Sequence, residues 1–189
     1  MARGHVELAV ETGDLDELDR ATDALDRMDE IIEGVLTLAR NGSQVDDPSA
    51  VELSEVAREA WTTVDVDGGA LNVETGDTTV RADEGRLRRL FENLFRNAAD
   101  HAGPAPAVTV EQLEDGFVVE DDGPGISDER RDDIFERGFS SAENGTGFGL
   151  AIVRNIAEAH GWRVVSVPGD GGARFEFHGV HTGQSPDSE

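Results

Sequence analysis

The chain of 189 residues carries 41 acidic and 16 basic side chains, which gives a formal net charge of −25. This length suffices for one full domain and a smaller appendage. The negative charge argues against nucleic-acid binding and against contact with anionic membranes, because phosphate contacts require clustered basic side chains. The chain has no cysteine, which excludes a disulfide framework and a thiolate metal site.

All sixteen basic residues are arginine, and the acidic residues are spread along the whole chain. This pattern indicates adaptation to a salt-rich cytoplasm, where screening weakens self-repulsion. The alternative is a GC-rich genome combined with an acidic disordered tail. No apolar run approaches the roughly twenty residues of a membrane span, and no signal peptide opens the chain. We therefore expect a cytoplasmic chain without membrane contact of its own, and any sensory or membrane part of a parent protein would lie upstream.

Residues 15–40 have the apolar period of a coiled-coil helix. Apolar side chains recur at seven-residue spacing in two interleaved rows: Leu18, Leu25, Ile32 and Ala39, and Ala21, Met28 and Val35. Gly4 to Thr12 resembles the end of a preceding helix, and Gly13-Asp14 a turn. Residues 1–40 are therefore predicted to be a partial helical hairpin that forms a homodimer. The alternative is one amphipathic helix packed on the main domain.

A linker is predicted at 41–49, because Gly, Ser, Asp and Pro occur there without periodicity. The main domain is predicted over 50–180, followed by a disordered polar tail at 181–189. Its expected helices are 52–63, 84–101 (capped by Asp83), a short acidic helix from Ser127 to near Phe135, and 148–160, which stops at Gly161. Its expected strands are 70–75, 79–82, 107–113, 117–121, 163–167 and 173–179. This order predicts an α+β fold: a two-layer α/β sandwich with helices on one face of a mixed sheet.

Two asparagines on the long predicted helix are candidate metal ligands. Asn93 and Asn97 lie four residues apart and project from the same face. An amide oxygen is a hard neutral ligand suited to Mg²⁺, which would bridge it to nucleotide phosphates. The alternative is that both side chains are simply solvated at the surface.

Two glycine-rich stretches follow this helix. Asp121-Asp-Gly-Pro-Gly125 comes at the end of an apolar strand, and an ordinary Asp-Gly loop is the alternative explanation. Gly145-Thr-Gly-Phe-Gly-Leu150 opens directly into a helix, so its N–H groups and the helix N-terminus favour a phosphate. No Gly-Lys-Ser/Thr follows, so this is not a Walker motif. Gly171-Gly172 is a weaker third stretch and is interpreted as structural.

The order of these elements resembles the N box and glycine boxes of the ATP-binding domain shared by histidine kinases, type II topoisomerases, a heat-shock chaperone and mismatch-repair ATPases. The details favour a sensor histidine kinase of two-component systems. The resemblance implies that ATP and Mg²⁺ are the cofactors, with the metal held by Asn97 alone or by Asn97 together with Asn93. It also implies that Asp121 accepts a hydrogen bond from the adenine amino group, with Gly123 and Gly125 shaping that pocket. Ile134 to Phe139 resembles the phenylalanine box, which would hinge a short ATP lid at Ser140–Asn144.

The complete set of ATP-binding residues expected from the resemblance is Asn93, Asn97, His101, Asp121, Gly123, Gly125, Phe139, Gly145, Thr146, Gly147, Gly149 and Leu150. His101 would stack on adenine or touch a phosphate. Arg137 has two alternative roles: it binds a phosphate, or it is an ordinary surface arginine. Asn93 stands where topoisomerase-like members have a glutamate that activates water, so a hydrolytic base is missing.

The expected acceptor histidine is not found in this chain. His5 has no following proline and is preceded by Gly4, so it is interpreted as a surface histidine. Two explanations remain: an N-terminally truncated kinase, which the half hairpin favours, or a module that acts on a partner in trans.

The predicted function is therefore the catalytic core of a histidine kinase that transfers the ATP γ-phosphoryl to a histidine for relay to a response-regulator receiver domain. The alternative is a non-catalytic ATP-binding protein that competes for a kinase or regulator. A third hypothesis is an ATPase that hydrolyses ATP.

Overall fold

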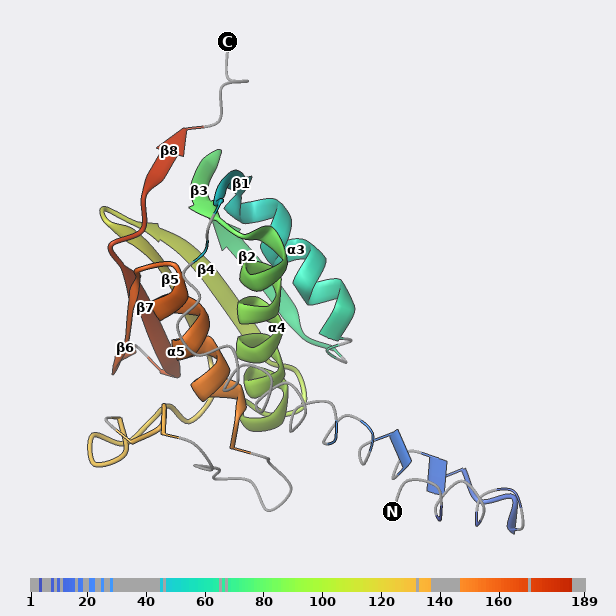
Figure 1. Ribbon diagram of the computed structural model, residues 1–189. Helices are drawn as coiled ribbons and strands as arrows, with labels where there is room; N and C mark the ends of the chain where they lie inside the picture. The colour runs from blue at the N-terminus through green and yellow to red at the C-terminus, as the bar shows by residue number, and fades with distance from the viewer. Residues whose placement is uncertain are drawn as a thin grey trace.

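The computed structural model describes residues 47–64, 66, 68–131, 133–136, 147–169 and 171–184, together with Val45 and the N-terminal positions 4, 8, 10, 12–15, 17, 18, 21, 22, 25 and 28. Helices and strands carry the labels of Figure 1. Among these residues, no helix combines the length and the apolar character needed to cross a membrane.

A five-stranded mixed sheet forms one layer of the molecule. Its strands are β2 (Ala70–Glu74), β4 (Ala107–Leu113), β5 (Gly116–Asp121), β7 (Ala173–His178) and β6 (Arg163–Pro168), in that spatial order. β2 and β4 are parallel, and the other neighbours are antiparallel. Helices α3 (Leu53–Val64), α4 (Glu84–His101) and α5 (Gly149–Ala159) cover one face (Figure 1). The predicted two-layer α/β fold is confirmed.

Aromatic rings from α4 and the sheet fill the space between the two layers. Phe91 and Phe95 of α4 stack with ring centroids 5.6 Å apart, and Phe117 and Phe177 of the sheet stack at 4.5 Å. Phe91 joins the two pairs through Phe117 at 5.7 Å. All four side chains are fully buried. Because stacked rings also bury large apolar areas, this cluster fixes α4 on the sheet.

The boundaries of α4 and α5 agree closely with the sequence. Asp83 caps α4, and its Oδ1 accepts a hydrogen bond from the N–H of Arg86 at 2.9 Å. α4 spans Glu84–His101 as predicted. α5 ends at Ala159, two residues before Gly161, whose φ of 76° favours glycine. The predicted strands of the main sheet are likewise confirmed to within a residue or two.

A small second sheet includes residues from the predicted linker and from the predicted disordered tail. β1 (Ser49–Glu52) and β8 (Thr182–Gln184) flank β3 (Thr78–Ala82), and both are antiparallel to it. The linker prediction had extended to residue 49, and the tail from 181 onward was predicted to be disordered. These strands pair with β3 through main-chain hydrogen bonds and are only four and three residues long, too short for the apolar alternation that identifies strands.

The short acidic helix predicted from Ser127 to near Phe135 is wrong for the part that the structure describes. The chain forms successive turns there, in which Arg130 N–H donates to Ser127 O and Asp133 N–H to Arg130 O. Ile134 and Phe135 are nevertheless buried, and the ring of Phe135 meets that of Phe175 edge-on at 6.3 Å. The burial of these two side chains, rather than helical periodicity, therefore fixes this segment.

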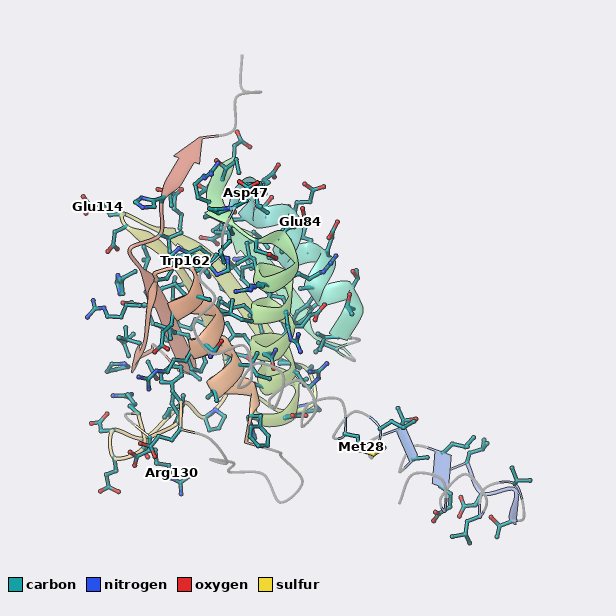
Figure 2. All side chains as sticks on the ribbon, in the orientation of Figure 1. Met28, Asp47, Glu84, Glu114, Arg130 and Trp162 are labelled. Carbon is teal, nitrogen blue, oxygen red and sulfur yellow. The ribbon has the colours of Figure 1, made fainter. Side chains whose placement is uncertain are left out.

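Near the N-terminus, the turn predicted at Gly13-Asp14 is confirmed. Gly13 has a φ of 72°, and the described positions before and after this turn are helical. Several apolar side chains of this region are exposed, including Leu18 at 41% and Met28 at 45% (labelled in Figure 2), whereas Ala21 is buried. Ile32, Val35, Ala39 and His5 lie outside the described residues, so the coiled-coil seam is described only in part.

Candidate nucleotide-binding site

Two asparagine side chains of α4 converge on the first residue of α5. Asn93 is 6% exposed, and its Nδ2 donates to the Arg89 carbonyl at 2.8 Å, which leaves its Oδ1 directed away from its own helix backbone. A Cβ added at Gly149 would lie 3.5 Å from the Oδ1 of Asn93 and 3.4 Å from the Oδ1 of Asn97. The two amide oxygens therefore face the same point, as the four-residue spacing predicts.

Asn97 also carries a buried polar group that no described residue of the chain satisfies. Among the described atoms, none accepts a hydrogen bond from its Nδ2. A buried donor without an acceptor costs free energy, so such groups commonly mark a place that a ligand or water completes. Two amide oxygens beside one unsatisfied N–H suit a cation that is itself bound to an anion.

The start of α5 adds a set of backbone donors at this point. Phe148 is the N-cap residue and makes no side-chain capping hydrogen bond, and Gly147 before it has a φ of 71°. The first N–H groups of a helix have no partner within the helix, and the helix dipole favours an anion there. Leu150 is half-buried and packs against the core. We call Asn93, Asn97 and Gly149, with this helix start, the α5 side of the site.

Asp121 lies at the end of β5, where backbone N–H groups fix its carboxylate. Its Oδ1 accepts from Gly123 N–H at 2.9 Å and from Ala173 N–H at 3.0 Å. No donor among the described residues reaches Oδ2. Burial raises the pKa of Asp121 and the charge of Asp122 adds to this, while the two N–H groups and His101 act in the opposite direction. The result is a half-buried acceptor with one oxygen held by the backbone and one available to a ligand.

Glycine permits the close packing around Asp121. A Cβ at Gly172 would overlap the backbone carbonyl of Asp121, so no other residue fits there without displacing the strand end. Gly125 has a φ of 72°, and a Cβ there would approach Gly172 O at 3.1 Å. Gly123 packs against Ala102, the residue that ends α4. We call Asp121, Gly123, Gly172 and Ala173 the Asp121 side of the site.

The structure thus brings together Asn93, Asn97 and Gly149 on one side, and Asp121, Gly123 and Gly125 on the other. His101 is the exposed last residue of α4, close enough for its charge to lower the pKa of Asp121, but no hydrogen bond joins the two. Phe139, Gly145 and Thr146 lie outside the described residues, as do Arg137 and the expected lid.

Two contributors to the site were not predicted from the sequence. Ala173 acts through its backbone N–H, which carries no side-chain signal. Gly172 was interpreted as structural, and its close approach to Asp121 is a contact between residues far apart in the chain. The two glycines that precede β7 could have indicated this contact, because glycine commonly marks a place where another backbone approaches closely.

Comparison with known proteins agrees with this arrangement. A model of the histidine kinase-, DNA gyrase B-, and HSP90-like ATPase family matches residues 82–180, just over half of the chain. Sensor histidine kinase ZraS of Klebsiella oxytoca is 33% identical over 177 residues, which cover 87% of this chain and 38% of that protein. The chain therefore spans well under half the length of this relative.

Solved structures of histidine kinases have the same fold. The mycobacterial sensor histidine kinase MprB matches with a TM-score of 0.62 and 28% identity, over 72% of this chain and 98% of that one. Full-length ShkA, crystallised in complex with AMPPNP, matches with a TM-score of 0.62 and 26% identity, over 90% of this chain and 39% of that one. On the family match, the order of the boxes and the geometry of the two sides of the site, this chain belongs to the histidine kinase-, DNA gyrase B- and HSP90-like ATPase family.

Proposed function

We propose that this chain is the ATP-binding catalytic core of a two-component sensor histidine kinase. The observation that carries the proposal is the convergence of the Asn93 and Asn97 amide oxygens on Gly149 at the start of α5. This point offers cation ligands and anion-binding N–H groups together, which is the combination that a metal-bound triphosphate requires. The similarity to ZraS, and to ShkA crystallised with AMPPNP, supports the same assignment.

The residues present fit Mg²⁺. Asn97, with Asn93, would hold the ion through amide oxygens, and the unsatisfied Nδ2 of Asn97 would donate to a phosphate oxygen. Bound Mg²⁺ would neutralise charge on the phosphates. The amide of Asn93 cannot accept a proton from water at neutral pH, so the site lacks a hydrolytic base at that position. A site of this kind keeps ATP intact until a phosphoryl acceptor arrives.

On the other side of the site, Asp121 would bind the adenine. Its Oδ1 already accepts two backbone N–H groups, so Oδ2 would accept the hydrogen bond of the adenine amino group. Gly147, Gly149 and Leu150 would frame the phosphates together with Gly145, Thr146 and Phe139. His101 would stack on the adenine or touch a phosphate.

The proposed reaction moves the γ-phosphoryl group from ATP to an imidazole nitrogen of an acceptor histidine. The bond from phosphorus to the ADP oxygen breaks, a phosphorus–nitrogen bond forms, and the imidazole proton leaves to a base supplied with the acceptor. Catalysis in such transfers is mostly positioning and electrostatic stabilisation. The phosphoryl group would then pass to an aspartate of a response-regulator receiver domain.

The N-terminal segment would form a homodimer. Its exposed apolar side chains (Leu8, Val10, Leu15, Leu18, Leu25 and Met28) would be covered by partner helices. The net charge of −25 without lysine supports a salt-rich cytoplasm as the working environment. Binding and turnover should therefore be measured at high salt.

Phosphotransfer to a supplied acceptor tests the proposal. The purified chain is incubated with Mg²⁺, γ-labelled ATP and a panel of histidine-bearing helical hairpins from sensor kinases of the same cell. We expect acid-labile label on at least one hairpin, with Asn97→Ala losing most of it. Asn155→Ala, a half-buried asparagine of α5 outside the site, serves as the matched control and should transfer normally.

Each failure of this experiment has its own meaning. ATP binding without label on any hairpin would indicate a non-catalytic protein that competes for a kinase or regulator. Rapid ATP hydrolysis without a hairpin would indicate an ATPase of the topoisomerase or chaperone kind.

A further inference from the structure

The end of α5 opposite the nucleotide site is tied to the start of α4 by His160. Its Nε2 accepts a hydrogen bond from the backbone N–H of Asp83 at 3.0 Å. Because Nε2 is the acceptor, the ring proton lies on Nδ1, which donates to the Ile156 carbonyl at 2.8 Å. Both ring nitrogens of this neutral imidazole are therefore used, one on each helix.

The surroundings of His160 hold its ring in this orientation. The ring stacks on Trp162, labelled in Figure 2, with centroids 4.4 Å apart and planes inclined at 25°. Trp162 is buried and meets Phe117 of the core edge-on at 6.0 Å. Burial lowers the pKa of His160, and Arg86 lowers it further, against opposing contributions from the Ile156 carbonyl and Asp83. The neutral ring is therefore favoured, as the bond from Asp83 requires.

The two helices that His160 joins are the ones that carry the α5 side of the site. α4 begins after Asp83 and carries Asn93 and Asn97, whereas α5 begins at Gly149 and ends beside His160. The helices are antiparallel, so one end of the pair holds His160 and the other holds the site. At a rise of about 1.5 Å per residue, the eleven residues of α5 separate these ends by roughly 16 Å. Because backbone hydrogen bonds link successive turns of a helix, a shift of α5 along its axis at His160 would also move Gly149.

Val45, which precedes the proposed catalytic domain in the chain, lies at the same end of α5. The N–H of Val45 donates to the carbonyl of Ala159 at 3.0 Å. Ala159 is the last residue of α5 and the neighbour of His160. A displacement of the chain at Val45 would therefore act on α5 next to the bond that fixes it to α4.

We propose that His160 is a positioning residue, which sets α5 along α4 and thereby sets the distance between Gly149 and the amides of Asn93 and Asn97. The segment at Val45 acts on the same junction. This inference rests on the proposed function, since it assigns His160 to the phosphate side of an ATP site. Its consequence is selective: affinity for the phosphates and metal depends on His160, whereas affinity for adenine at Asp121 does not.

The test compares two ligands and two substitutions. The ligands are adenosine, which lacks phosphates, and AMPPNP with Mg²⁺, both titrated calorimetrically at high salt. His160→Gln retains an acceptor long enough to reach Asp83 N–H, whereas the shorter His160→Asn does not. We expect His160→Asn to weaken Mg²⁺-AMPPNP binding roughly tenfold, because small misplacements of binding groups have large effects. Adenosine affinity should stay at the wild-type value, and His160→Gln should restore most of the loss.

His181→Gln is the matched control, because the His181 side chain is exposed and His181 bonds Arg81 through its backbone carbonyl, which the substitution keeps. An equal loss of affinity for both ligands in His160→Asn, or no loss for either, would overturn the proposal and leave His160 a purely structural residue. If His160→Asn does not fold, His160→Gln provides the test. A partial loss of Mg²⁺-AMPPNP affinity with wild-type adenosine affinity in that variant supports the proposal. An equal loss of affinity for both ligands overturns it. Absence of nucleotide binding in the wild-type protein would instead refute the proposed function.

Discussion

The Asp121 side and the α5 side of the site differ in how completely the protein satisfies its own polar groups. At Asp121, two backbone N–H groups hold one carboxylate oxygen, and glycine packing leaves no room for the strand end to move. At α5, the Nδ2 of Asn97 is buried without a partner among the residues that the structure describes, and Phe148 gives the helix start no side-chain cap. The first side is preorganised, whereas on the proposed function the second would be completed by a bound ligand. We therefore expect that some substitutions at these two sides change mainly the free energy of unfolding and others mainly the affinity for ligand.

The largest effect is expected from Gly172→Ala. The added methyl group would overlap the Asp121 carbonyl, so β7 and the end of β5 would have to separate. Overpacking of this kind typically costs about 3 kcal/mol, and the free energy of unfolding should fall by that order. Urea unfolding of Gly172→Ala and of the control variant measures this change in the free energy of unfolding. Gly171→Ala is the control: a Cβ there has no neighbour within 4 Å, so its stability should stay close to wild type.

Asp121→Asn should separate binding from folding on the same side. The amide oxygen can still accept from Gly123 and Ala173, but an NH₂ group replaces Oδ2 and would face the adenine amino group, donor against donor. We expect ATP affinity to fall by about 2 kcal/mol, the magnitude of a hydrogen bond to a charged group, with the unfolding midpoint little changed. Asp122→Asn removes a neighbouring charge and is the control. Wild-type ATP affinity of Asp121→Asn, in calorimetry at high salt, would refute this placement of the adenine.

On the α5 side, Asn97→Ala should weaken binding without weakening the fold. The substitution removes a buried donor that has no partner, so the free energy of unfolding without ligand should not decrease. Mg²⁺-dependent enhancement of ATP affinity should fall by roughly tenfold or more, because loss of a group that only orients a metal ligand already costs about tenfold, while adenosine affinity stays constant. A drop in stability comparable to that of Gly172→Ala would contradict the contrast between the two sides.

The smallest effect concerns pH. Burial lowers the pKa of His160 below its ordinary value of 6.5, so the unfolded chain binds a proton more readily than the folded one. The contribution of His160 to the free energy of unfolding is therefore fully present above pH 6.5, and it is lost as the pH falls through the pKa of His160 in the folded protein. The loss of unfolding free energy below pH 6.5 should be smaller in His160→Gln than in wild type. Identical pH profiles for the two proteins would show that this histidine does not titrate differently on folding.

Much of the fold was predictable because its signals are local. The α4 boundaries follow from the Asp83 cap and helical periodicity, and the end of α5 follows from Gly161. β1 and β8 were missed because they are only four and three residues long, too short to show a side-chain pattern, and pair with the distant strand β3. The helix expected after Ser127 was wrong because acidic composition indicated a helix where buried Ile134 and Phe135 impose turns.

The site was predictable where one helix or one loop brings its residues together. Asn93 and Asn97 meet because of helical spacing, and Asp121 and Gly123 are two residues apart. Gly172 and His160 could not be assigned in this way, because their contacts are with Asp121 and Asp83, on strands and helices distant in the sequence. Only the packed structure makes those contacts apparent.

The three-stranded sheet has a mechanical consequence. β1, through which the chain enters the domain, and β8, near its exit, are both antiparallel to β3 and hence parallel to each other. Arg81 N–H extends the same ladder by donating to His181 O at 3.1 Å. Tension between the two ends of the domain would therefore act along the strands and load several hydrogen bonds at once, rather than opening them one at a time. We expect the domain to withstand pulling from its neighbours without disturbing the nucleotide site.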